Sequence, residues 1–132
     1  IHKDLYLAPI EIGQVFRLNN VFFDFDKYTL RPESFVELDR VVGFLNEYPN
    51  IEIEMSAHTD NKGSDEYNMK LSDNRARSVR EYILSKGIAA TRIISQGYGE
   101  TKPVADNNHD DGTDNPEGRQ LNRRVEFKIL KN

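Results

Sequence analysis

Residues 51–78 read IEIEMSAHTDNKGSDEYNMKLSDNRARS, and the period of the hydrophobic pattern changes within them. At the start of this stretch, Ile51, Ile53 and Met55 alternate with acidic or polar residues. A period of two predicts a strand with one buried face and one solvated face. We therefore expect a strand over 51–57, whose end delivers the next polar residues to a loop.

A helix is expected after that loop. Ser72 is of a type favoured at helix N-caps, and Gly87 is typical of the left-handed residue that follows a helix C-terminus. Between them the apolar residues recur at the three-to-four spacing of one buried face: Ala76, Val79, Ile83 and Leu84. The pattern predicts a helix that begins at Ser72, with Arg75 in its first turn.

The flanking segments extend this alternation of strands and helices. We expect a strand in 14–26 with a turn or bulge at Asn19 and Asn20, a helix over 32–48 that buries Phe35, Leu38, Val41, Val42 and Leu45, a short strand beginning at Ile93, a long polar loop over 103–120 and a strand over 125–130. Strands separated by helices imply right-handed crossovers and parallel neighbours, whereas the last strand can join in either direction. The expected fold is an α/β two-layer sandwich: a mixed four-stranded sheet in the order βαβαββ, with helices on one face.

Length and hydropathy limit the organisation of the chain. Its 132 residues suit one domain with one core. We expect an N-terminal tether or edge segment over 1–13 and a domain over 14–132. Apolar runs fall short of the roughly 20 residues that cross a bilayer, and no secretory signal opens the sequence. We therefore expect any membrane contact to be made by segments outside this sequence.

Charge and residue types exclude several classes of function. With 18 basic and 22 acidic residues the net charge is -4, which gives no basic field for nucleic acid. The absence of cysteine excludes disulfides and thiolate chemistry. His2, His58 and His109 show neither metal-ligand spacing nor a catalytic triad pattern. We expect no nucleic-acid partner, no metal and no cofactor.

Polar residues gather where the predicted strands end and the helices begin, which is where ligands settle in open α/β sheets. Asp24 and Asp26 follow the first strand, and Thr59 and Asp60 follow the second. At a helix N-terminus, partial positive charge makes an arginine unfavourable by about 0.3–1 kcal/mol unless an anion neutralises it. The expected position of Arg75 therefore predicts that something negative approaches it.

One carboxylate and one guanidinium in a shared cleft would fit a zwitterion. A guanidinium holds a carboxylate through two parallel hydrogen bonds, and an aspartate accepts from an ammonium. The charges leave an alternative open, in which Asp60 and Arg75 pair with each other and pin the loop.

Five separated blocks of the chain carry a family resemblance. They are FFDFDKYTL at 22–30, AHTDNKGSDEYNMKLSDNRARSV at 57–79, GI and the following arginine within 87–92, GYGETKPVADN at 97–107 and NRRVEF at 122–127. In this order they resemble the OmpA-like C-terminal domain family, whose members include OmpA, Pal and MotB. The family usually has glycine before HTD, where this chain has Ala57.

The resemblance implies a periplasmic domain that binds peptidoglycan without a covalent bond and attaches an outer-membrane protein or lipoprotein to the wall. The recognised group is diaminopimelate of the stem peptide, whose side-chain end carries an ammonium and a carboxylate on one carbon. By position, Asp60 would accept from the ammonium and Arg75 would hold the carboxylate. The family positions that would line or close the pocket are Thr59, Asn68, Leu71, Asp24 and Arg123 or Arg124. Strand alternation places Arg123 on the Val125 side and Arg124 on the opposite face, which favours Arg123.

Two enzymatic interpretations have less support, and we expect no catalysis. FFDFDKYT is similar to the nucleophile loop of aspartyl-phosphate phosphotransferases, but its threonine stands one place too far along and no lysine and acidic pair follows to hold Mg²⁺. Hydrolysis by paired carboxylates needs one acid with a raised pKa, whereas carboxylates beside Arg75 would stay ionised.

Two binding alternatives also remain. Asp106, Asn108, Asp110 and Glu117 fall at calcium-loop positions 1, 3, 5 and 12 of a helix-loop-helix site, but Asp111 replaces the required glycine, so a solvated loop is favoured. The domain could instead be an interaction module that docks another envelope protein rather than the wall.

Overall fold

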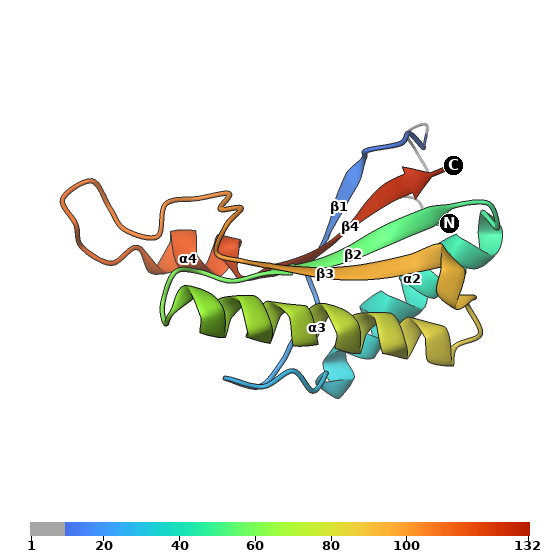
Figure 1. The fold of residues 1–132 in the computed structure, drawn as a ribbon, viewed down its shortest axis with the longest axis horizontal. Coiled ribbons are helices and arrows are strands. Elements are labelled where there is room, and N and C mark those ends of the chain that lie inside the picture. The colour runs from blue at the N-terminus through green and yellow to red at the C-terminus, as the bar shows by residue number, and fades with distance from the viewer. Residues whose placement is uncertain (1–9) are drawn as a thin grey trace.

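The computed structural model describes residues 10–132. A four-stranded sheet forms one layer, and α2 (Phe35–Glu47) and α3 (Asp65–Ser85) form the second layer on one of its faces (Figure 1). Short 3₁₀ turns, η1 (Pro32–Ser34) and η2 (Ala90–Arg92), precede α2 and the third strand. The predicted α/β sandwich with a mixed sheet is confirmed.

The last strand lies inside the sheet. The strands are β1 (Val15–Leu18), β2 (Glu52–His58), β3 (Ile93–Gly99) and β4 (Arg124–Lys131), in the spatial order β1-β4-β2-β3. β2 and β3 are parallel, whereas β4 is antiparallel to both of its neighbours. The end of β2 therefore lies beside the start of β4, with His58 opposite Arg124. This insertion brings the polar residues after β2 next to the NRR segment.

Strand alternation builds the core as the sequence predicts. Ile51, Ile53 and Met55 are buried, and Phe16 and Phe44 pack against Phe127, with ring centroids 5.0 and 5.8 Å away. In α2 the fully buried residues are Leu38, Val41, Phe44 and Leu45, whereas Phe35 and Val42 are half-buried.

α3 begins earlier than predicted. Its N-cap is Ser64, whose hydroxyl accepts from the Tyr67 amide at 3.1 Å, and not Ser72. The buried face continues toward the N-terminus through Asn68 and Ser72, at the same spacing as the apolar positions that follow them. Because these two residues are polar, a search for apolar periodicity does not detect this part of the helix.

Ser72 holds α3 against β3. Its hydroxyl accepts a hydrogen bond from the Gly99 amide at 2.9 Å. A Cβ added to Gly97 would lie 2.2 Å from the Asp73 backbone nitrogen, so only glycine permits this approach. The helix therefore lies directly on the strand at the end of the sheet that carries the predicted site.

Two further predictions of element boundaries are wrong. The predicted loop over 103–120 contains the start of a helix, α4 (Pro116–Asn122), whose N-cap Asn115 accepts from the Gly118 amide. The first strand ends at Leu18, and the following aromatic residues form a loop joined by one bridge between Phe23 and Leu30.

Most of the predicted N-terminal tether, residues 1–9, lies outside the described residues. Past that point the Gly13 amide donates to the Ile129 carbonyl at 2.8 Å, so the backbone just before β1 already lies along β4. Across residues 10–132, every helix is too short or too polar to cross a bilayer.

Candidate functional site

The predicted site lies at the end of the sheet where β2 finishes and β4 begins. Thr59 ties the loop after β2 to β3, since its amide donates to the Gly99 carbonyl at 2.8 Å. Its hydroxyl donates to the Asp60 carbonyl at 2.7 Å. Thr59 and Asp60 are both buried. The two hydrogen bonds of Thr59 therefore fix the backbone that carries the Asp60 side chain.

The Asp60 carboxylate is held from three directions. The Lys62 amide donates to Oδ1 at 2.9 Å, Arg123 Nη1 donates to Oδ2, and Arg119 Nη1 lies 3.9 Å from Oδ1. The Asp60 side chain is 9% exposed and that of Arg123 is 43% exposed. One partner of the Asp60–Arg123 ion pair is thus fixed in the protein and the other reaches solvent.

Arg119 is a second arginine beside Asp60, and it anchors the neighbouring residue Asn61. Its buried guanidinium donates to Asn61 Oδ1 at 2.6 Å, to Asn108 Oδ1 at 2.8 Å and to Asp114. The residue next to Asp60 is therefore joined to the long loop over 103–115 by one side chain. Nothing in the hydrophobic pattern indicates that Arg119 is buried, so sequence reasoning missed it.

Asn122 is a second buried polar residue that orders the long loop. Its Oδ1 accepts from the Val104 and Ala105 amides at 2.7 and 3.1 Å, and its Nδ2 donates to the Ala105 carbonyl and to Asn107. The predicted solvated loop is consequently folded onto the start of β4.

A stripe on α3 links the Asp60 loop to the loop after β1. Asn68, half-buried Leu71 and Arg75 follow one another at three- and four-residue spacing. Asn68 Nδ2 lies 3.4 Å from the Asp60 carbonyl and 3.1 Å from Glu100 Oε1. The structure therefore brings the predicted α3 residues to the same side as Asp60.

Arg75 holds a turn of the loop after β1. Its Nε donates to the Lys27 carbonyl at 2.8 Å and its Nη2 to the Asp24 carbonyl at 3.3 Å, while its guanidinium lies over the Phe23 ring. The Lys27 amide closes the same turn onto the Asp24 carbonyl, with Asp26 at a φ of 65°. Arg75 thus fixes the loop through backbone carbonyls.

Burial and the nearby positive charge of Arg123 lower the pKa of Arg75, although the negative charge of Asp26 opposes them. Arg75 and Arg123 therefore act on each other electrostatically. Within residues 10–132 the structure places no ion pair between Asp60 and Arg75. The alternative in which these two residues pin the loop by pairing is wrong.

The helix-terminus argument for Arg75 is also wrong. Arg75 lies in the middle of α3, and the N-terminus of the helix carries Asp65 and Glu66 instead. The partial charge of the first turn therefore does not act on Arg75.

Asp24 contributes through its backbone. Its carboxylate is engaged by Arg31 Nη1 at 2.8 Å, and its carbonyl accepts from Arg75.

Arg124, as the alternation predicts, lies on the other face of the sheet, where Nε donates to Glu126 at 2.8 Å.

A second charged cluster occupies that other face, and we call His58, Arg124 and Glu126 the rear cluster. His58 Nε2 lies 3.2 Å from Ser56 Oγ and 3.4 Å from Glu126 Oε1. The side chains of His58 and Arg124 are each 3% exposed, and that of Glu126 is 19% exposed. The hydrogen bond from His58, followed by Arg124, lowers the pKa of Glu126 from 4.5 to about 2.

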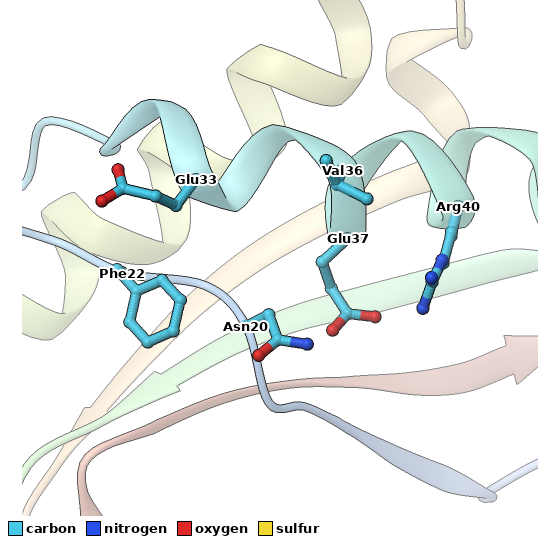
Figure 2. Close-up of a pocket in the computed structure, with 6 residues that line it drawn as sticks. All are labelled: Asn20, Phe22, Glu33, Val36, Glu37 and Arg40. Carbon is cyan, nitrogen blue, oxygen red and sulfur yellow. The ribbon is translucent and has the colours of Figure 1, made fainter.

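Two other regions are separate from this site. Among residues 10–132, no group of three or more histidine or acidic side chains is arranged to hold a metal ion, and Asn108 of the calcium-like pattern is bonded to Arg119. A hollow of about 280 Å³ lies between the loop after β1 and α2. Phe22 and Val36 are among its lining residues (Figure 2). Its lining includes none of the predicted site residues.

Comparison with known proteins gives relatives over nearly the whole chain. The chain is 50% identical over 122 residues to photosystem I P700 chlorophyll a apoprotein A2 of Gloeobacter violaceus, covering 92% of this chain and 14% of that protein. It is 41% identical over 123 residues to outer membrane porin F of Pseudomonas fluorescens, covering 92% of this chain and 35% of the porin. The chain thus spans about a third or less of these two relatives.

A solved structure agrees with the fold. The peptidoglycan-associated lipoprotein from Burkholderia pseudomallei superposes with a TM-score of 0.67 at 26% identity, covering 85% of this chain and 88% of that one. The family model described as the OmpA family matches residues 22–116. Because this match covers most of the chain and includes the loop after β1, Asp60 and α3, the protein belongs to the OmpA family.

Proposed function

We propose that this domain binds cell-wall peptidoglycan without a covalent bond, through the diaminopimelate residue of the stem peptide. Membership of the OmpA family supports this function, as does the likeness to a protein named a peptidoglycan-associated lipoprotein. The observation that carries the proposal is the nearly buried Asp60 carboxylate, set beside Arg123 on the side of the molecule where Arg75 lies.

The chemistry of the ligand matches these charges. The side-chain end of diaminopimelate carries an ammonium, for which Asp60 is an acceptor, and a carboxylate, for which a guanidinium is the preferred partner. The hydrogen bonds of Arg75 use Nε and Nη2, and we assign its Nη1 to a ligand oxygen. Thr59, Asn68 and Leu71 would line the pocket, and the turn at Asp24 would close it.

Binding of this kind is expected to be modest. The two ion pairs would be open to water on the side of the ligand and contribute little each, which places the dissociation constant in roughly the micromolar range. The proposal includes no step in which a covalent bond breaks, because the Asp60 carboxylate serves as the acceptor for the ligand ammonium.

The location follows from the same function. One relative is named an outer membrane porin and the solved neighbour is named a lipoprotein. We place the domain in the periplasm, where it would tether to the wall a protein attached to the outer membrane by another part of its chain.

Retention on purified sacculi tests the function. Asp60→Asn keeps the shape of the side chain and removes the charge, and we expect retention to fall at least tenfold because the ammonium loses its partner. The matched control is Arg77→Lys, at an exposed arginine of α3 that pairs with Asp73. Circular dichroism verifies folding of each variant. Wild-type retention by a folded Asp60→Asn protein would contradict the proposed site and favour docking to another envelope protein.

A further inference from the structure

Arg123 occupies the atom of Asp60 that the proposed ligand needs. The Lys62 amide already uses Oδ1, and Arg123 Nη1 donates to Oδ2. Each carboxylate oxygen can accept a second hydrogen bond, but an incoming ammonium at Oδ2 meets the positive charge of a guanidinium already bound there. This observation bears on selectivity, because a ligand that displaces Arg123 needs a second charged group to compensate for the lost Asp60–Arg123 ion pair.

We propose that Arg123 is a specificity-determining residue, whose ion pair with Asp60 opens for a ligand end carrying both an ammonium and a carboxylate and stays closed against an ammonium alone. The inference rests on the proposed function, and it names the device by which the same site would select diaminopimelate over lysine.

The two partners of the ion pair differ in freedom of movement. Asp60 is fixed by the Lys62 amide and by burial, whereas the Arg123 side chain is 43% exposed and its Nη2 donates to Gln120 Oε1 at 3.2 Å. The backbone of Arg123 is held in place, since its amide donates to the Arg119 carbonyl at 3.0 Å. Only the guanidinium of Arg123 has to swing for Oδ2 to become accessible.

Arg119 has no such freedom. Its side chain is 9% exposed, and it is bonded to Asn61, Asn108 and Asp114 at once. It therefore remains near Asp60 whether or not ligand is present. The selective response belongs to Arg123, because a buried guanidinium with three partners is costly to displace.

Counting ion pairs gives the selectivity. An ammonium alone replaces Arg123 at Asp60 and leaves that guanidinium without a partner, near the positive charges of Arg75 and Arg119. A zwitterionic end also replaces Arg123 at Asp60, but its carboxylate then takes up the released guanidinium. Apart from the contact of the ligand carboxylate with Arg75, the number of ion pairs that Asp60 and Arg123 make stays at one in the first case and rises to two in the second, so the second exchange is the favourable one.

Titration calorimetry with two synthetic tripeptides tests the inference. The probes are L-Ala-D-isoGlu-diaminopimelate and L-Ala-D-isoGlu-L-lysine, which differ by one carboxylate. We expect the wild type to prefer the first by tenfold or more. In Arg123→Gln the lysine peptide should bind several-fold more tightly than to the wild type, and the preference should shrink to about threefold. Arg123→Lys keeps a competing charge and should retain most of the preference, and Arg77→Gln should behave as wild type.

The results of the titrations distinguish a failure of this inference from a failure of the proposed function. If Arg123→Gln weakens the diaminopimelate peptide and leaves the lysine peptide unchanged, Arg123 is a simple ligand contact and the competition is refuted. An unchanged preference in that variant refutes it as well. If the folded wild type binds neither tripeptide, recognition of diaminopimelate itself fails, and the inference fails with it.

Discussion

Two charged clusters lie on opposite faces of the sheet, at the same end of β2 and β4, and they differ in how much water reaches them. In the rear cluster Arg124 is 3% exposed and uses its guanidinium on Glu126, the Asn122 carbonyl and the Lys102 carbonyl. In the Asp60–Arg123 pair the arginine is 43% exposed. The rear cluster makes its ion pairs within the protein, although His58 Nδ1 is buried there without a hydrogen-bond partner among the described residues. In the Asp60–Arg123 pair one partner reaches solvent, as the proposed exchange with a ligand requires. The neighbouring residues Arg123 and Arg124 therefore differ in how far solvent reaches their guanidinium groups.

The largest effect on stability should come from Arg124. Arg124→Ala would remove the guanidinium that binds Glu126 and the carbonyls of Asn122 and Lys102, leaving His58 as the remaining partner of the Glu126 carboxylate, and breaking a buried pair costs about 3 kcal/mol. We expect the free energy of unfolding, measured in urea, to fall by about this amount. A loss below about 1 kcal/mol would show that the rear cluster is no more enclosed in solution than the Asp60–Arg123 pair.

The difference between Arg123 and Arg124 is partly predictable from the sequence. Alternation along β4 correctly places Arg124 opposite to Val125, just as alternation in β2 identifies Ile53 and Met55 as core residues. These predictions work because each depends on one strand and a period of two. Membership of the family is likewise carried by blocks that are contiguous in sequence.

What the sequence could not provide depends on contacts between distant segments. The Asp60–Arg123 pair exists because β4 inserts between β1 and β2, and no local period encodes that order. The burial of Arg119 and the early start of α3 at Asp65 were missed because the inward-facing residues there are polar. Hydrophobic periodicity detects only apolar packing, and this end of the molecule is packed with side-chain hydrogen bonds.

Acid should weaken the rear cluster through Glu126. The folded-state pKa of Glu126 is lowered to about 2 from 4.5, so its ionised form stabilises the folded state above pH 4.5, and this contribution is lost as the pH falls toward 2. Melting temperatures measured from pH 6 to pH 2 should drop over this window. In Glu126→Gln the drop should be smaller, and an identical drop in both proteins would show that other carboxylates cause it.

Salt should weaken ligand binding at Asp60 and Arg75 more than it weakens the rear cluster. The Debye length falls from about 10 Å at 0.1 M to about 3 Å at 1 M, and screening is strongest for charges that water reaches. We expect retention on sacculi to decline several-fold over this range while the free energy of unfolding changes little. Binding that is unaffected by salt would contradict an ionic contact at Asp60 and Arg75.

The smallest effect on stability should come from Arg123→Ala. The pair that Arg123 forms with Asp60 is open to solvent on the arginine side, and such pairs contribute about 0–1 kcal/mol. Asp60 would keep the Lys62 amide and the nearby Arg119, so its carboxylate is not left unsatisfied. Unfolding in urea should therefore place this variant within about 1 kcal/mol of the wild type, far from Arg124→Ala. A loss as large as that of Arg124→Ala would mean that Arg123 is a structural residue, and that its guanidinium is not available for exchange with a ligand.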